Sequence, residues 1–188
     1  MGGGPKSAGL QAMRPPADPA LAADLVAAAH LTGRFVLRSG AISGEYFDKF
    51  RFESDPKLLR RIARRMIDLL PPATQILAGL ELGGVPIATA MSLECGLPAV
   101  FVRKARKTYG TCRAVEGARI DGKTLAVIED VISTGGAIGD AAVLMREEGG
   151  IIGAVVCAVW RGAGDPAIAV LPDIPVHAAF LQSELTRP

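Results

Sequence analysis

The chain has 188 residues, of which 49% are hydrophobic and 21% are charged, and this balance predicts one globular domain with a substantial core. A formal net charge of only +2 gives no argument for a nucleic-acid or membrane-surface partner. No apolar stretch approaches the roughly 18 residues of a spanning helix, and Asp24 interrupts the only early apolar segment, so we expect neither a membrane anchor nor a signal peptide. The three cysteines are far apart and lack metal-ligand spacing, which predicts reduced thiols in a cytoplasmic protein.

Residues 1–18 are rich in Gly, Pro and Ala without periodicity, and we expect them to form a disordered extension. A helix is predicted over residues 19–31, because Asp18 is a suitable N-cap and Pro19 a suitable first residue. His30 lies near the end of this segment, where a capping or packing role is expected.

Residues 34–52 alternate in polarity and include several aromatic residues, a pattern that predicts two short strands joined by a polar loop at Ser39 to Glu45. A helix is predicted next, from about residue 54 to Leu70, because apolar residues recur there at helical spacing. Its opposite side carries a group of arginines without interleaved aromatics, which we interpret as a solvated face and not as a nucleic-acid surface. These are Arg60, Arg61, Arg64 and Arg65.

Beyond residue 74, short apolar runs alternate with helical patterns, as is typical of a doubly wound α/β fold with a mainly parallel sheet. Strands are predicted at residues 75–78, 99–102, 124–128 and 151–159, with an edge strand at 175–181. Helices are predicted at residues 85–95 and 136–148.

The strand predicted at residues 124–128 leads into two carboxylates, Glu129 and Asp130, and then into Ser133, Thr134 and two glycines. Hydroxyls and free backbone N–H groups at a helix N-terminus suit a phosphate, and glycine lets the backbone come close to it. The carboxylates suit hydroxyl donors, such as a ribose diol, or a metal ion. The combination predicts a site for a ribose 5-phosphate.

The segment VIEDVISTGGA, residues 127–137, resembles the phosphoribosyl-diphosphate (PRPP) signature of type I phosphoribosyltransferases. Two further segments narrow the resemblance to orotate phosphoribosyltransferases: LRSG followed by the cluster YFD, and RKARKTYG, which fits the pattern R-K-x-x-K-x-[HY]-G. The resemblance covers about residues 21–180. It implies the type I phosphoribosyltransferase fold, with residues 19–188 as one domain whose first part, to about residue 53, forms a small hood.

The resemblance also implies roles for individual residues. The PRPP-binding set is Arg38, Arg103, Lys104, Lys107, Tyr109, Glu129, Asp130, Val131, Ile132, Ser133, Thr134, Gly135, Gly136 and Ala137. The expected catalytic residues are Lys107, Asp130 and Glu129, and the orotate-binding set is Tyr46, Phe47, Ser133 and Arg161. The bidentate guanidinium of Arg161, at the end of a predicted strand, suits the carboxylate of orotate. Histidine is commoner in the family at Tyr109, and tyrosine does not titrate near neutrality, so no acid role is carried over.

The reaction that the resemblance implies is orotate plus PRPP to orotidine 5′-monophosphate plus pyrophosphate, in pyrimidine synthesis. Mg²⁺ is implied as the cofactor, held mainly through PRPP. Pyrophosphate would lie at Gly79–Gly84, where some members have Tyr-Lys at the positions of Leu82 and Gly83, so only backbone contacts are expected here. A homodimer is implied, with the loop Arg103–Gly117 shared across subunits. This loop has few apolar residues, and we expect it to be mobile without ligand.

Two other interpretations stay open. A purine phosphoribosyltransferase would share the PRPP loop but not the spacing of RKARKTYG, and a non-catalytic PRPP-sensing regulator would be expected to carry a nucleic-acid-binding module, for which we see no spare length. A third, an NTPase, is rejected. GARIDGKT, residues 117–124, satisfies the P-loop pattern, but its lysine and threonine lead into a strand where a P-loop would open a helix.

Overall fold

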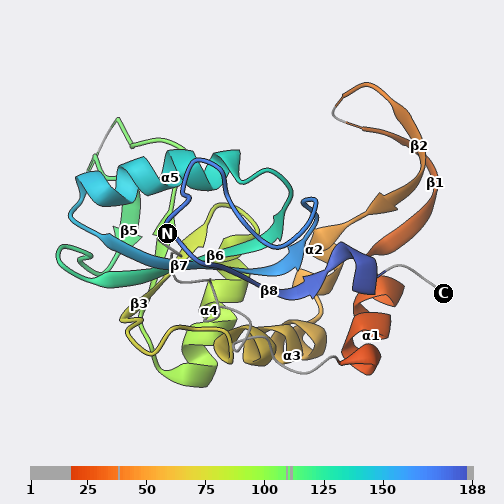
Figure 1. The fold of residues 1–188 in the computed structure, drawn as a ribbon, viewed down its shortest axis with the longest axis horizontal. Coiled ribbons are helices and arrows are strands. Elements are labelled where there is room, and N and C mark those ends of the chain that lie inside the picture. The colour runs from red at the N-terminus through yellow and green to blue at the C-terminus, as the bar shows by residue number, and fades with distance from the viewer. Residues whose placement is uncertain (1–17, 38, 109, 111, 186–188) are drawn as a thin grey trace, which may run out of the picture.

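The computed structural model describes residues 18–185 except residues 38, 109 and 111. Its main sheet contains β3 (Ile76–Leu80), β4 (Ala99–Val102), β5 (Val115–Gly117), β6 (Thr124–Ile132), β7 (Ile151–Trp160) and β8 (Val176–Leu181). The strand order is β5-β4-β3-β6-β7-β8, and every neighbouring pair is parallel except β4 and β5 (Figure 1). The predicted α/β class with a mainly parallel sheet is confirmed.

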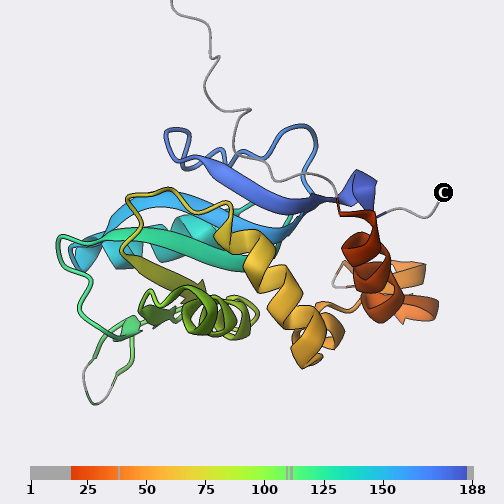
Figure 2. The same cartoon turned by 90° about the horizontal axis from the view of Figure 1, so that it is seen from below.

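Helices cover both faces of this sheet. One face carries α5 (Gly136–Glu147), and the other carries α3 (Pro56–Ile67) and α4 (Gly84–Cys95), with α1 (Pro19–Ala29) beside them (Figures 1 and 2). Alternate residues of a strand point to opposite faces, so Leu125 and Val127 of β6 pack in the core under α5, whereas Ala126 and Ile128 pack in the core of α3 and α4. All four side chains are fully buried, and β6 is therefore the two-sided apolar strand that the sequence predicts.

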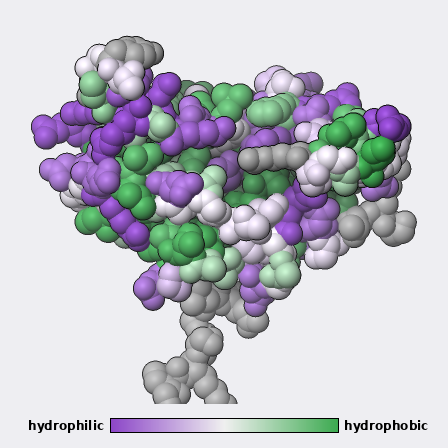
Figure 3. Space-filling model, turned by 90° about the horizontal axis from the view of Figure 1, so that it is seen from above, coloured by the Kyte–Doolittle hydropathy of each residue, from purple (hydrophilic) through white to green (hydrophobic). Residues whose placement is uncertain are grey.

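The hood comprises α1, a hairpin of β1 (His30–Val36) and β2 (Ile42–Phe47), and the short helix α2 (Lys49–Glu53). Asp18 caps α1 by accepting a hydrogen bond from the N–H of Leu21 at 2.9 Å; the rest of the predicted extension lies outside the described residues. The hairpin projects from the body as an arm (Figure 1), and hydrophobic residues lie on the surface of this arm (Figure 3).

Two expectations for the hood are wrong. The second strand begins at Ile42, inside the expected loop, and ends at Phe47, because Asp48 accepts a hydrogen bond from the N–H of Phe50 at 3.2 Å and starts α2. The first helix ends at Ala29 and not at Leu31: His30 is its C-cap, as expected, because its backbone N–H donates to the carbonyl of Val26, but His30 also opens β1, where its Nε2 lies 3.3 Å from Glu45 Oε2 across the hairpin.

One arginine of the predicted solvated face of α3 is buried. Arg65 Nε donates to the carbonyl of Ala179 in β8 at 2.9 Å, and its guanidinium lies 4.8 Å from the centre of the Phe180 ring. The other three arginines are exposed as predicted. Arg65 therefore packs α3 against the edge of the sheet.

The long basic segment after β4 is also anchored more firmly than expected. Its second half forms β5, in which Val115 pairs with Val102, and the side chains of Ala114, Val115 and Ile120 are buried. The absence of apolar anchors therefore holds only for its first half. Among the residues that the structure describes, no helix is both long and apolar enough to cross a bilayer.

Candidate functional site

The carboxyl ends of β3, β4, β6 and β7 meet at one edge of the sheet because these strands are parallel neighbours. Ile132 is in register with Trp160, and the N–H of Arg161 donates to the carbonyl of Ile132 at 2.7 Å. Ser133 and Arg161, which follow these strands, therefore leave the sheet next to each other. The structure brings together two predicted site residues that are 28 positions apart in the sequence.

The turn from Ser133 to Gly136 connects β6 to the N-terminus of α5. Ser133 and Thr134 are exposed, and Gly135 has a φ of 77°, in the left-handed region. A Cβ on Gly135 would lie 2.7 Å from Ile168 Cγ1, so both its conformation and the available space require glycine. Exposed hydroxyls before a 12-residue helix form the type of turn that accepts a phosphate.

The two carboxylates lie inside β6, which runs further than predicted, to Ile132. Their carboxyl groups lie close enough to interact, because a side-chain hydrogen bond to Asp130 contributes to the raised pKa of Glu129. Asp130 is 0% exposed and its Oδ2 lies 2.6 Å from Nζ of Lys49 in α2. Glu129 is partly buried, and its Oε1 accepts a hydrogen bond from the N–H of Asp130 at 3.1 Å.

The charges around Asp130 are strongly coupled. Burial and the negative charge of Asp130 raise the pKa of Glu129 to about 8, and the same two causes raise the pKa of Glu53 to about 8. Burial lowers the pKa of Lys49, but its hydrogen bond to Asp130 and the nearby carboxylates outweigh burial, and the pKa is raised. The cluster thus contains three carboxyl groups around one ammonium group.

The structure adds Lys49 and Glu53 to the candidate site beside Asp130, and sequence reasoning missed both. Both belong to α2, which was expected to be a strand. Their spacing of four residues would have placed them on one face of a helix, beside the aromatic cluster at Tyr46 and Phe47. The signal was short, because α2 has only five residues.

The glycine-rich loop after β3 rests directly on this cluster. Gly83 is buried, and a Cβ there would lie only 1.5 Å from Asp130 Oδ2. The exposed tip of the loop is Leu82, which is 65% exposed and follows a cis peptide bond from Glu81. Glu81 also connects this loop to the basic loop, because its Oε1 accepts a hydrogen bond from the N–H of Lys104 at 2.7 Å.

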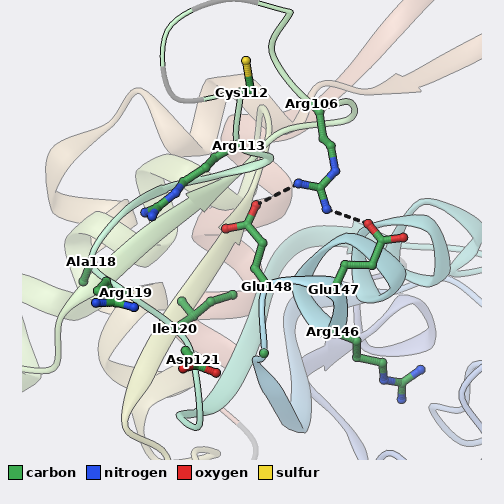
Figure 4. A pocket seen from close by; sticks show the side chains of 11 residues that line it. Arg106, Cys112, Arg113, Ala118, Arg119, Ile120, Asp121, Arg146, Glu147 and Glu148 are labelled. Atoms are coloured by element: carbon green, nitrogen blue, oxygen red, sulfur yellow. Dashed lines mark hydrogen bonds and ion pairs between the residues drawn. The ribbon is translucent and has the colours of Figure 1, made fainter.

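The cations of the basic loop pair with acidic groups away from the turn at Ser133. Lys107 Nζ forms an ion pair with Glu116, and Arg103 Nη1 lies 3.9 Å from the same carboxylate. Arg106 reaches the C-terminal end of α5, with contacts of 2.6 Å to Glu147 and 3.6 Å to Glu148 (Figure 4). Of the other PRPP-binding residues predicted here, Arg38 and Tyr109 lie outside the described residues.

A hollow of about 550 Å³ lies beneath this part of the loop. Figure 4 shows Arg106, Arg113 and Arg119 around it, together with Glu147 and Glu148 at the end of α5. Residues just before β6 and β7 also line it, so it lies at the amino ends of the strands, at the sheet edge opposite to Ser133 and Arg161. It is therefore separate from the candidate site.

The two predicted aromatic residues of the hood differ in environment. Tyr46 is 44% exposed on β2 and stacks on Phe35, with 5.4 Å between ring centres. Phe47 points to the other side of the strand, lies 6.4 Å from the ring of Phe52, and packs against the core. Tyr46 is thus the one that is open to a ligand in this arrangement.

Comparisons with known proteins identify the family. Residues 53–171 match the family model of the phosphoribosyl transferase domain. The chain is 53% identical over 169 residues to the orotate phosphoribosyltransferase of Nocardioides sp. (strain ATCC BAA-499 / JS614), covering 89% of this chain and 94% of that one. It is 40% identical over 154 residues to that of Methanocella arvoryzae, covering 81% and 87%. The crystal structure of Mycobacterium tuberculosis orotate phosphoribosyltransferase has a TM-score of 0.80 and 28% identity, covering 90% and 98%. The chain therefore belongs to the orotate phosphoribosyltransferases, within the phosphoribosyltransferase family.

Proposed function

We propose that this protein transfers the 5-phosphoribosyl group from PRPP to orotate, giving orotidine 5′-monophosphate and pyrophosphate in pyrimidine synthesis. The observation that carries the proposal is the register of β6 and β7, which sets the phosphate-type turn Ser133–Gly136 beside Arg161. One substrate anion binds at the turn and the other at the arginine, so the reacting atoms lie between them. The identities of 53% and 40% to proteins named orotate phosphoribosyltransferase support the same reaction.

The ribose 5-phosphate part of PRPP is assigned to the turn and to the end of β6. The hydroxyls of Ser133 and Thr134 and the N-terminus of α5 bind the phosphate, and the backbone of residues 131–137 surrounds it. Glu129 accepts hydrogen bonds from the ribose hydroxyls. Asp130 is fully buried beneath the loop at Gly83 and supports the same site from there.

Orotate is assigned to the space between Arg161 and the hood. Arg161 is exposed, and its planar guanidinium can donate two parallel hydrogen bonds to the orotate carboxylate. Ser133 offers a hydroxyl to the pyrimidine ring from the adjacent strand end. Tyr46 covers the ring from the hood, and Phe47 holds β2 against the core.

The reaction breaks the bond between the anomeric carbon and the diphosphate oxygen while a ring nitrogen of orotate forms a new bond to that carbon. Positive charge develops on the ribose and negative charge on the leaving diphosphate, so the protein contributes mainly electrostatic stabilisation. Lys107, Arg103 and Lys104 offset the charge on the diphosphate. Lys107 and Arg103 must first leave Glu116, and this movement closes the basic loop over the site and excludes water.

Mg²⁺ fits the oxygen donors at this edge, since carboxylates and hydroxyls are the hard ligands that it prefers. The ion would be held mainly through the oxygens of PRPP itself. When bound, Mg²⁺ supplies further positive charge against the departing diphosphate.

We also propose a cytoplasmic homodimer with the loop Arg103–Gly117 shared across subunits. The exposed hydrophobic side chains of the hood arm support an interface, with Val36 70% and Ile42 59% exposed. The three cysteines are free thiols, which fits a reducing compartment. Light scattering after gel filtration tests the dimer, because a monomeric mass at micromolar concentration contradicts it.

The reaction is tested by mixing the protein with PRPP, Mg²⁺ and orotate and following the loss of orotate absorbance, with adenine, guanine and uracil as parallel substrates. Magnesium-dependent consumption of orotate alone supports the proposal. Consumption of adenine or guanine would indicate a purine phosphoribosyltransferase. If no base is consumed but PRPP raises the melting temperature, the protein is a PRPP sensor, and a gel shift with bulk nucleic acid then tests for a regulator.

A further inference from the structure

The ion pair between Lys49 and Asp130 connects the hood to the acidic end of β6. Asp130 is fully buried, and Lys49 approaches it from α2, two residues after Phe47 in the hood. We propose that Lys49 is a positioning residue for the transfer reaction: it holds the Asp130 carboxylate under the loop at Gly83 and so fixes the hood and that loop relative to each other. This inference rests on the proposed function and deepens it.

The first argument is that Asp130 needs a cation where it lies. A buried carboxylate that has lost its water must be paired or it takes up a proton. Glu129 and Glu53 are the other carboxyl groups close to Asp130; the negative charge of Asp130 raises the pKa of each, and neither can supply the positive charge that Asp130 needs. Lys49 is the ammonium group that faces all three carboxyl groups.

The second argument is that the other groups of the cluster cannot hold Asp130 in place of Lys49. Glu53 is 7% exposed, and its Oε1 has no hydrogen-bond partner among the described residues. Asp48, the cap of α2, adds a further negative charge near Glu53. The Cys157 side chain of β7 is also close to this cluster, but burial raises the pKa of its thiol, which stays neutral. Lys49 is therefore the cation that the described residues provide to Asp130.

The third argument is that a displacement of Asp130 reaches the substrate-binding segments. Gly83 leaves no space above the carboxylate, since a Cβ would meet Asp130 Oδ2 at 1.5 Å and Glu53 Oε1 at 3.0 Å. Movement of Asp130 must therefore move the loop that also carries Leu82 and Glu81. Because Glu81 binds the backbone of Lys104, the start of the basic loop moves too.

The test compares Lys49→Met, Lys49→Arg and a control, Lys57→Met, which removes an exposed lysine near the start of α3. Steady-state kinetics give kcat and the KM for PRPP, and the pH profile of kcat/KM is measured for each variant. We expect Lys49→Met to raise the KM for PRPP at least tenfold. The acidic limb of the profile should move to higher pH, because Glu129 and Glu53 lose the cation that lowers their pKa. Lys49→Arg should leave the acidic limb at its wild-type pH, and Lys57→Met should match the wild type in both the kinetic constants and the pH profile.

A double-mutant cycle with Asp130→Asn separates positioning from general destabilisation. If Lys49 acts through Asp130, the variant Lys49→Met/Asp130→Asn is no worse than Asp130→Asn alone. It also leaves no unpaired buried charge at Asp130, so it remains measurable even if Lys49→Met does not fold. Losses that multiply, or an unchanged KM and unchanged acidic limb in a folded Lys49→Met variant, overturn the proposal.

Failure of the proposed function gives a different result. In that case the wild type itself consumes no orotate, and PRPP binding is measured by calorimetry. A PRPP affinity that falls in Lys49→Met but not in Lys57→Met still supports positioning of the loop by Lys49. Equal affinities in the two variants overturn it.

Discussion

Replacing Gly83 with alanine tests how tightly the loop after β3 rests on the buried carboxylate. The added Cβ would lie 1.5 Å from Oδ2 and 2.4 Å from Cγ of Asp130, so either the loop or the carboxylate must move. Asp130 cannot rotate into water, because it is fully buried and paired with Lys49. Overpacking alone costs about 1–3 kcal/mol, and disruption of a buried ion pair costs about 3–5 kcal/mol. We expect Gly83→Ala to lower the free energy of unfolding by roughly 3–5 kcal/mol.

The assay is urea denaturation followed by the fluorescence of Trp160, the single tryptophan, which is 4% exposed in the folded state. At roughly 2–4 °C per kcal/mol for a chain of this size, the melting temperature should fall by about 10 °C. Gly44→Ala is the matched control, because a Cβ there meets no atom within 4 Å. The KM for PRPP should rise in Gly83→Ala alone. Equal stability of the two variants, with equal KM values, would refute the steric reasoning.

Four further predictions concern the site and its surroundings. Lys107→Ala should lower kcat far more than it weakens orotate binding, since Lys107 acts on the leaving diphosphate; equal losses in both contradict that role. Arg161→Ala should raise the KM for orotate by about tenfold or more while the KM for PRPP changes little, because it removes a charged hydrogen-bond pair worth about 1.5–3 kcal/mol. The raised pKa of Glu53, about 8 in the folded protein against 4.5 ordinarily, contributes stability that is fully present below about pH 4.5 and is lost as the pH rises through about 8. Glu53→Gln removes this loss. Between pH 5 and pH 9, the free energy of unfolding measured by denaturation should therefore fall less in the variant than in the wild type, by on the order of 2 kcal/mol. An identical pH dependence in the two proteins contradicts the burial argument. Glu147→Gln should free Arg106 and increase proteolysis of the basic loop in the absence of PRPP, and an unchanged cleavage rate would show that this ion pair does not hold the loop.

Local patterns in the sequence were sufficient for most of the fold. Strand β4 has the predicted bounds, and α4 and α5 differ from the predictions by one residue each, because apolar periodicity and glycine stops are local signals. The PRPP signature and the basic segment pointed to the family for the same reason, since each is a continuous stretch. The errors occur where a short local feature decides the structure. Asp48 starts a helix inside a segment with strand-like alternation, and Arg65 is buried where it donates a hydrogen bond to a carbonyl of β8.

The sequence by itself determined the order of elements, the phosphate-type turn after β6 and the membership of the family. Tertiary structure decided how the two neighbouring acids are used. In the sequence Glu129 and Asp130 form one acidic pair, but in the fold Asp130 is fully buried and paired with Lys49 of α2, whereas Glu129 is only partly buried. Burial and charge then act across elements that are about 80 residues apart, and no local pattern records such a contact.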